Sequence, residues 1–149
     1  MTRTVIPAFG AKNFENSDWI VENAEILESN NSLKLNVYPV DVKRLILDPM
    51  IINDNINVNV NRAKYVHVRL KTILESNSEH AVWWNKNGYH DACLQVYFKT
   101  ENNNAYSQDK RVYANYRSGN MTDVYVDMSK NSLWNGNLTG LRIDPTEVV

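Results

Sequence analysis

The sequence predicts an all-β fold, an antiparallel sandwich or barrel of about eight or nine short strands. Three observations lead to this expectation. Short runs alternate apolar and polar side chains, which is the period of a strand with one buried face. Clusters of Asn, Asp, Ser and Gly, which favour turns, separate the runs. Helical periodicity is weak, so no helices are expected between the strands.

The strand candidates begin after residue 32 and follow one another closely. In chain order they are Leu33–Tyr38, Val42–Leu47, Ile51–Asn61, Tyr65–Ile73, Ala81–Trp84, Ala92–Lys99, Lys110–Tyr116, Thr122–Asp127 and Leu138–Asp144. The first alternates strictly. The second is more apolar and ends before a Pro, so a short turn or helix near Val40–Leu45 competes with the strand interpretation.

Asparagine dominates the third candidate, Ile51–Asn61. It accounts for 22 of the 149 residues, and it is normally depleted in strands. Here four asparagines alternate with three apolar residues: Asn55, Ile56, Asn57, Val58, Asn59, Val60 and Asn61. The alternation predicts a strand with one wet face, or an edge strand.

The later candidates place apolar side chains on one face. Tyr65–Ile73 is the clearest, Ala81–Trp84 is short, and Thr122–Asp127 offers two valines. The apolar sets of the clearest runs are Val66, Val68 and Leu70, then Leu94, Val96 and Phe98, and then Val112, Ala114 and Tyr116.

The last candidate follows a Gly-rich turn that begins at Trp134. Leu141 and Ile143 point to one side of it, and Arg142 and Asp144 to the other. The strand is expected to stop at Pro145, because proline cannot donate a ladder hydrogen bond.

Bulk properties describe one domain without a strong charge. The length of 149 residues fits a single domain, taken as residues 14–149, preceded by an arm of residues 1–13 that could dock on a neighbour. The formal net charge of −1 disfavours nucleic-acid binding. The single cysteine, Cys93, is expected to be buried, and no disulfide can form within the chain. No signal peptide and no membrane span are expected.

Three segments together resemble jelly-roll, galactose-binding-like carbohydrate-binding modules. They are Phe14-Glu15 followed by Trp19, Leu47-Asp48-Pro49 followed by the run from Tyr65 to Lys71, and the closing run from Trp134 to Pro145. The resemblance spans nearly the whole chain. It implies a jelly-roll β-sandwich that binds a carbohydrate without catalysing a reaction.

The resemblance implies two alternative sugar sites. On a concave sheet face, the expected residues are His67, Arg69, Gln95, Tyr97, Arg111 and Tyr113. At the loops on one edge, they are Trp83, Trp84, Asn85, Tyr89 and His90. For each set the competing interpretation is structural: one of the adjacent tryptophans packs in the core, and the two tyrosines form ordinary cross-strand pairs.

The family often holds a structural calcium, and Glu15 and Asp144 match its positions. Calcium requires six to eight oxygen ligands, and two side chains fall short of that number. The preferred interpretation is therefore that Asp144 pairs with Arg142 or caps the Pro145 turn. No other cofactor is expected.

Motifs for catalysis are missing from the sequence. The histidines at 67, 80 and 90 do not have metal-ligand spacing, and no nucleophile elbow or phosphate loop occurs. We expect a non-enzymatic phage virion surface protein, a capsid-decorating or accessory protein that meets host or mucosal glycans and reaches the outside by lysis. The arm would contact other virion proteins or a second copy. The alternatives are a free-standing glycan adhesion module associated with polysaccharide degradation and, third, a small glycan-acting enzyme.

Overall fold

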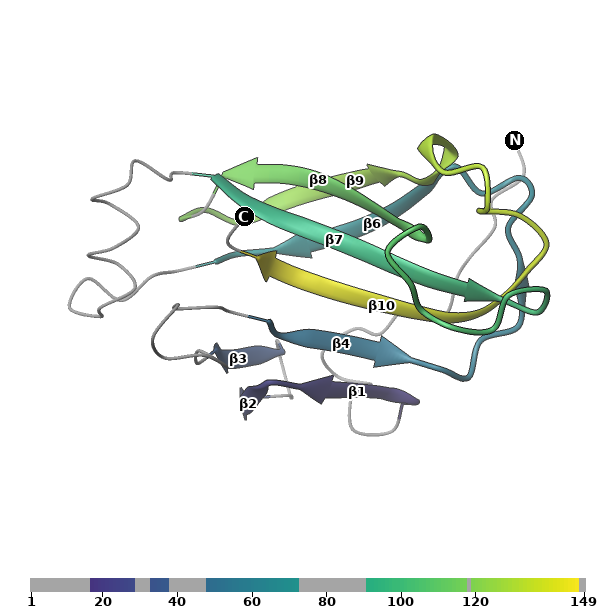
Figure 1. Cartoon of the computed structure of the whole chain (residues 1–149). Coiled ribbons are helices and arrows are strands. Elements are labelled where there is room, and N and C mark those ends of the chain that lie inside the picture. Colours follow the sequence, from purple (N-terminus) through teal and green to yellow (C-terminus); the bar gives the residue numbers. More distant parts are fainter. Residues whose placement is uncertain (1–16, 29–32, 38–47, 73–90, 118, 148–149) are drawn as a thin grey trace.

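The computed structural model describes residues 17–28, 33–37, 48–72, 91–117 and 119–147 (Figure 1). It confirms the all-β fold, with antiparallel sheets packed as a sandwich. Its strands are β1 (Trp19–Glu22), β2 (Ala24–Glu28), β3 (Lys34–Val37), β4 (Met50–Asn53), β5 (Val58–Asn59), β6 (Tyr65–Leu70), β7 (Asp91–Thr100), β8 (Arg111–Arg117), β9 (Thr122–Asp127) and β10 (Asn137–Glu147). One 3-10 turn, η2 (Met128–Lys130), follows β9.

The strands form one large sheet and two small ones. The large sheet has the order β1-β4-β10-β7-β8, and β5 pairs with the start of β10. Every pair in it is antiparallel. β6 and β9 form a second sheet, which lies behind β7 and β8 in Figure 1, and β2 and β3 form a hairpin beside β1.

The core lies between the large sheet and the β6–β9 sheet. Phe98 of β7 is fully buried and meets the ring of Trp134 edge to face, with ring centroids 5.1 Å apart. Trp134 Nε1 donates to the Ala63 carbonyl at 2.8 Å, which satisfies its only polar atom. Other buried apolar side chains come from both sheets, as the alternation predicted; they include Val66, Leu94, Val96, Val112, Tyr116, Val124, Val126, Leu141 and Ile143.

The last strand is central rather than terminal, because β10 pairs with β4 on one side and β7 on the other. The expectation that it stops at Pro145 is wrong, since it continues to Glu147. Its register with β7 shifts between Asp144 and Glu147, so Pro145 lies where the ladder is interrupted and no donor is needed. The Pro145 carbonyl instead accepts a hydrogen bond from the Tyr116 hydroxyl at 2.7 Å.

The asparagine-rich candidate is two strands, not one. Asn53 Oδ1 accepts a hydrogen bond from the Asn55 amide at 2.9 Å, and Asn59 Oδ1 accepts one from the Asn61 amide at 3.0 Å. Each bond is local to its own turn. The first bond follows the end of β4 and the second follows the end of β5, so asparagine side chains compete with the ladder where each strand ends.

Sequence alternation missed β1 and β2, which precede the first candidate. The strand prediction at β9 is confirmed with the same ends, and those at β3, β6, β7 and β8 are confirmed with shifted ends. Cys93 is buried, as expected. The arm and the candidates Val42–Leu47 and Ala81–Trp84 lie outside the described residues. Within those residues, no helix has the length and apolar character needed to cross a membrane.

Candidate functional site

The candidate site is the outer face of the large sheet, the side that faces away from the core. Its side chains form rows across the strands. In one row Arg142 of β10 stands opposite Tyr97 of β7, which stands opposite Arg111 of β8. In the next row Asp144 stands opposite Gln95, which stands opposite Tyr113. Directly opposed side chains interact across a sheet, so these two rows act as one layer.

Arg142 is held from three sides in this layer. Its Nε and Nη2 donate to the two oxygens of Asp144 at 2.8 and 2.7 Å, and Asp48 lies 3.7 Å from Nη2. The guanidinium also lies over the Tyr97 ring, 4.5 Å from its centroid. The preferred interpretation of Asp144, a pair with Arg142, is confirmed. Burial raises the pKa of Asp144 although Arg142 opposes the shift.

Arg111 is oriented by two neighbours on β7. Its Nη1 donates to Gln95 Oε1 at 3.1 Å and to the Tyr97 hydroxyl at 3.3 Å. Gln95 and Tyr97 face outward, as expected for the concave-face site, but they are only 4% and 6% exposed. β7 lies between β8 and β10, so its outward side chains are covered by those of both neighbouring strands. Gln95 and Tyr97 therefore fix the position of the Arg111 guanidinium.

A second polar cluster lies along the same face. Tyr106 donates to Asp54 Oδ1 at 2.8 Å, and Lys99 Nζ lies 3.1 Å from the same oxygen. Partial burial opposes ionisation of Asp54, but the hydrogen bonds from Tyr106 and Lys99 outweigh it and lower the pKa. Sequence reasoning missed this cluster. Gly140 lies beside the cluster, and a side chain there would meet both Lys99 and Tyr106, but a lone glycine in a strand does not identify its neighbours.

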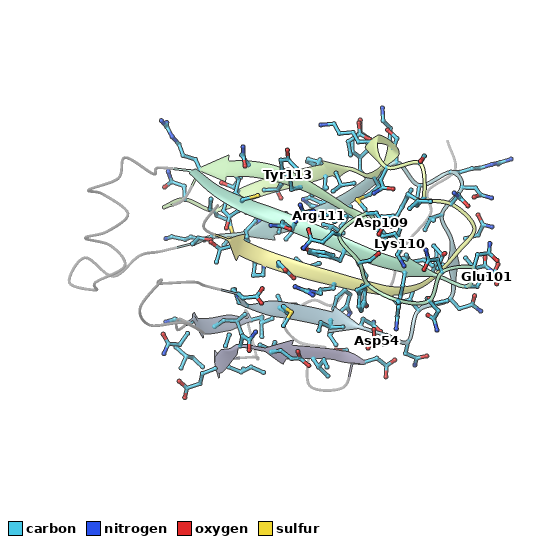
Figure 2. All side chains as sticks on the ribbon, in the orientation of Figure 1. Asp54, Glu101, Asp109, Lys110, Arg111 and Tyr113 are labelled. Carbon is cyan, nitrogen blue, oxygen red and sulfur yellow. The ribbon has the colours of Figure 1, made fainter. Side chains whose placement is uncertain are left out.

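Tyr113 is the exposed member of the layer. It lies two residues after Arg111 on β8, on the same face of the strand (Figure 2). Its side chain is 61% exposed, whereas Tyr97 in the neighbouring strand is buried. β8 is at the edge of the described sheet, so Tyr113 has a neighbour on one side only.

The expected single face does not exist, because His67 and Arg69 belong to the other sheet. They lie on the outer face of the β6–β9 sheet, where His67 Nε2 contacts Asp123 Oδ1 at 2.8 Å. The imidazole stacks on Tyr125 at 4.5 Å, and Tyr65 meets Tyr125 edge to face. These side chains are all strongly exposed. Six residues predicted together are thus divided between opposite sides of the sandwich.

The other predicted site residues lie outside the described residues: Trp83, Trp84, Asn85, Tyr89, His90 and Glu15. Of the two calcium candidates only Asp144 is described, and both its oxygens bind Arg142. In the described part of the chain, no three His, Cys, Asp or Glu side chains gather as metal ligands would.

The layer is formed by Gln95, Tyr97, Arg111, Tyr113, Arg142 and Asp144. No protein-family model, no curated protein and no solved structure matches the chain. The residues of the layer therefore carry the functional argument alone.

Proposed function

We propose that this protein is a non-enzymatic carbohydrate-binding module that holds a saccharide on the outer face of the large sheet. The observation that carries the proposal is the pair on β8. Tyr113 offers an exposed ring, and Arg111 beside it is fixed by Gln95 and Tyr97. An aromatic ring can stack on the apolar face of a pyranose, while guanidinium donors bind its hydroxyls.

The rigidity of the layer supports binding. Gln95, Tyr97 and Asp144 are buried and hydrogen-bonded, so they have already lost their rotamer freedom in the folded protein. A ligand that meets pre-organised groups orders few additional side chains, which lowers the entropic cost of binding. We also propose that the sandwich is a jelly roll.

The carboxylates of this face support a binding role over hydrolysis. A glycosidase uses two carboxyl groups that flank the scissile bond as acid and as base or nucleophile. Here Asp144 is engaged by Arg142, and Asp54 by Tyr106 and Lys99. Neither is held ready for proton transfer to a ligand beside Tyr113.

We further propose that the module is displayed on a phage virion as a capsid-decorating or accessory protein, where the sugar would come from a host or mucosal surface. A nearly neutral, asparagine-rich chain supports display, because it offers polarity without a long-range field. Peptide mass spectrometry of purified particles tests this placement. Absence from particles would favour the alternative, a free-standing adhesion module associated with polysaccharide degradation.

A glycan array with two matched variants tests the binding proposal. Tyr113 and Tyr125 are equally exposed but lie on opposite sides of the sandwich. Tyr113→Ala is expected to weaken the best array ligand about tenfold, the equivalent of ~1.4 kcal/mol. Tyr125→Ala is expected to leave binding unchanged. The reverse result would move the site to the β6–β9 sheet, and no binding to any glycan by the wild type would refute the proposal.

A further inference from the structure

Arg111 differs from Arg142 and Lys99, two other cations on the outer face of the large sheet. Arg142 pairs with Asp144 and Asp48, and Lys99 pairs with Asp54. Among the described residues, the Arg111 side chain is hydrogen-bonded only to neutral groups, Gln95 and Tyr97. No carboxylate of the described residues forms an ion pair with it.

The hydrogen bonds of the Arg111 side chain show which edge of its guanidinium remains available. A guanidinium has five N–H donors, two of them on Nη1. Nη1 of Arg111 contacts both Gln95 Oε1 and the Tyr97 hydroxyl, which uses its two hydrogens. The Nε and Nη2 donors have no partner among the described residues. Those two atoms form the edge that binds a carboxylate with two parallel hydrogen bonds.

The same sheet already contains that interaction. Arg142, one strand beyond Tyr97, uses Nε and Nη2 to bind both oxygens of Asp144 at 2.8 and 2.7 Å. Arg111 and Arg142 stand on opposite sides of Tyr97 in one cross-strand row. Arg142 therefore has its carboxylate from within the chain, whereas the equivalent edge of Arg111 has none.

We infer that the ligand of this site is an acidic saccharide, a uronic or sialic acid residue whose carboxylate binds the Nε–Nη2 edge of Arg111. This rests on the proposed carbohydrate-binding function and names its ligand class. Tyr113, exposed two residues along the same strand face, stacks on the sugar ring. The buried Gln95 and Tyr97 fix the guanidinium, so Arg111 needs little reordering to receive the carboxylate.

Calorimetric titration with paired probes tests the ligand class without altering the protein. The probes are oligogalacturonate and its methyl ester, and sialyllactose and lactose. We expect at least one acidic probe to bind about 10- to 100-fold more tightly than its neutral partner, because charge-assisted bidentate hydrogen bonds are lost in the neutral form. The preference is expected to shrink as salt is added, since screening weakens an exposed ion pair.

Two variants of Arg111 test whether this residue binds the carboxylate of the acidic probe. Arg111→Gln is expected to abolish the preference for the acidic probe, and Arg111→Lys to retain only part of it, because lysine keeps the charge but not the fork of donors. Arg69→Gln is the matched control, since Arg69 is exposed on the opposite side of the sandwich and should leave the preference intact. Unchanged melting temperatures would show that the variants are folded.

The outcomes separate the two proposals. If acidic and neutral probes bind equally, the carboxylate inference is wrong while the carbohydrate-binding function stands. If Arg69→Gln removes the preference, the carboxylate binds the opposite sheet and the inference is again wrong. If no saccharide binds, the proposed function fails and the inference fails with it.

Discussion

The outer faces of the two sheets have similar residue types but opposite physical character. On the large sheet Arg142, Asp144, Gln95 and Tyr97 are packed into a connected layer that is largely buried. On the outer face of the β6–β9 sheet, Arg69, Asp123 and Tyr125 are exposed to solvent. Arg69 and Asp123 are 3.9 Å apart, a looser contact than the 2.7 Å between Arg142 and Asp144.

The difference follows from the number of neighbouring strands. β7 and β10 each have a partner on both sides, so an outward side chain is covered from two directions. β6 and β9 have one described partner each. Removing one partner of an ion pair costs more where solvent is excluded, because the remaining charge is left buried and unpaired. The large-sheet face should therefore be the rigid one, and the small-sheet face adaptable.

The strongest test removes one carboxylate from each face. Asp144→Ala leaves Arg142 with only Asp48 and the Tyr97 ring as partners. The Arg142 side chain is 22% exposed, so its charge would be left largely buried. We expect a loss of about 3 kcal/mol in the free energy of unfolding. Asp123→Ala breaks an exposed contact and should cost at most about 1 kcal/mol. Urea denaturation measures both, and equal losses would mean that the two faces do not differ as described.

Crowding at Gly140 should loosen the large-sheet face locally. A Cβ there would lie 2.6 Å from the Tyr106 hydroxyl and would also meet Lys99. Gly140→Ala should destabilise the protein by about 1–2 kcal/mol, since both side-chain ends can move away.

A double-mutant cycle with Tyr106→Phe identifies the cause. If the added methyl group displaces Tyr106 from Asp54, removing the hydroxyl should cost less in the Gly140→Ala background than in the wild type. Strict additivity would show that the strain lies elsewhere.

Acid should weaken the Asp54 cluster, the smallest of the three effects. The pKa of Asp54 is lowered from its ordinary value of 3.8, so its contribution is present above 3.8 and is lost as the pH falls through the folded-state pKa. Asp54 is 56% exposed, which limits the effect to about 1 kcal/mol or less. Denaturation of wild type and Asp54→Asn should differ well above pH 3.8 and converge well below it; a difference that grows in acid would contradict this sign.

Much of the fold could be predicted from alternation alone, and the reason is local. The side chains expected inside, such as Leu94, Val96 and Phe98, are inside because a strand turns alternate residues to the same face. The Asp144–Arg142 pair was also predictable, since residues two apart on a strand share a face. β1 and β2 were missed, because their sequences, Trp-Ile-Val-Glu and Ala-Glu-Ile-Leu-Glu, do not alternate strictly between apolar and polar residues.

The candidate site was predicted only in part. Arg111 and Tyr113 are on one face as expected, but His67 and Arg69 are not, since alternation does not say which strands share a sheet. The Asp54–Tyr106 contact joins residues 52 positions apart, and nothing local in the sequence indicates it.

The sequence by itself therefore determined that this chain is an antiparallel all-β fold, a sandwich or a barrel, and which side of most strands faces the core. Tertiary structure alone decided that β10 and β7 lie in the middle of the large sheet, and that Gln95 and Tyr97 on β7 are consequently buried. The physical reason is that a strand's period of two is a property of consecutive residues, whereas neighbours and burial depend on pairing between distant segments.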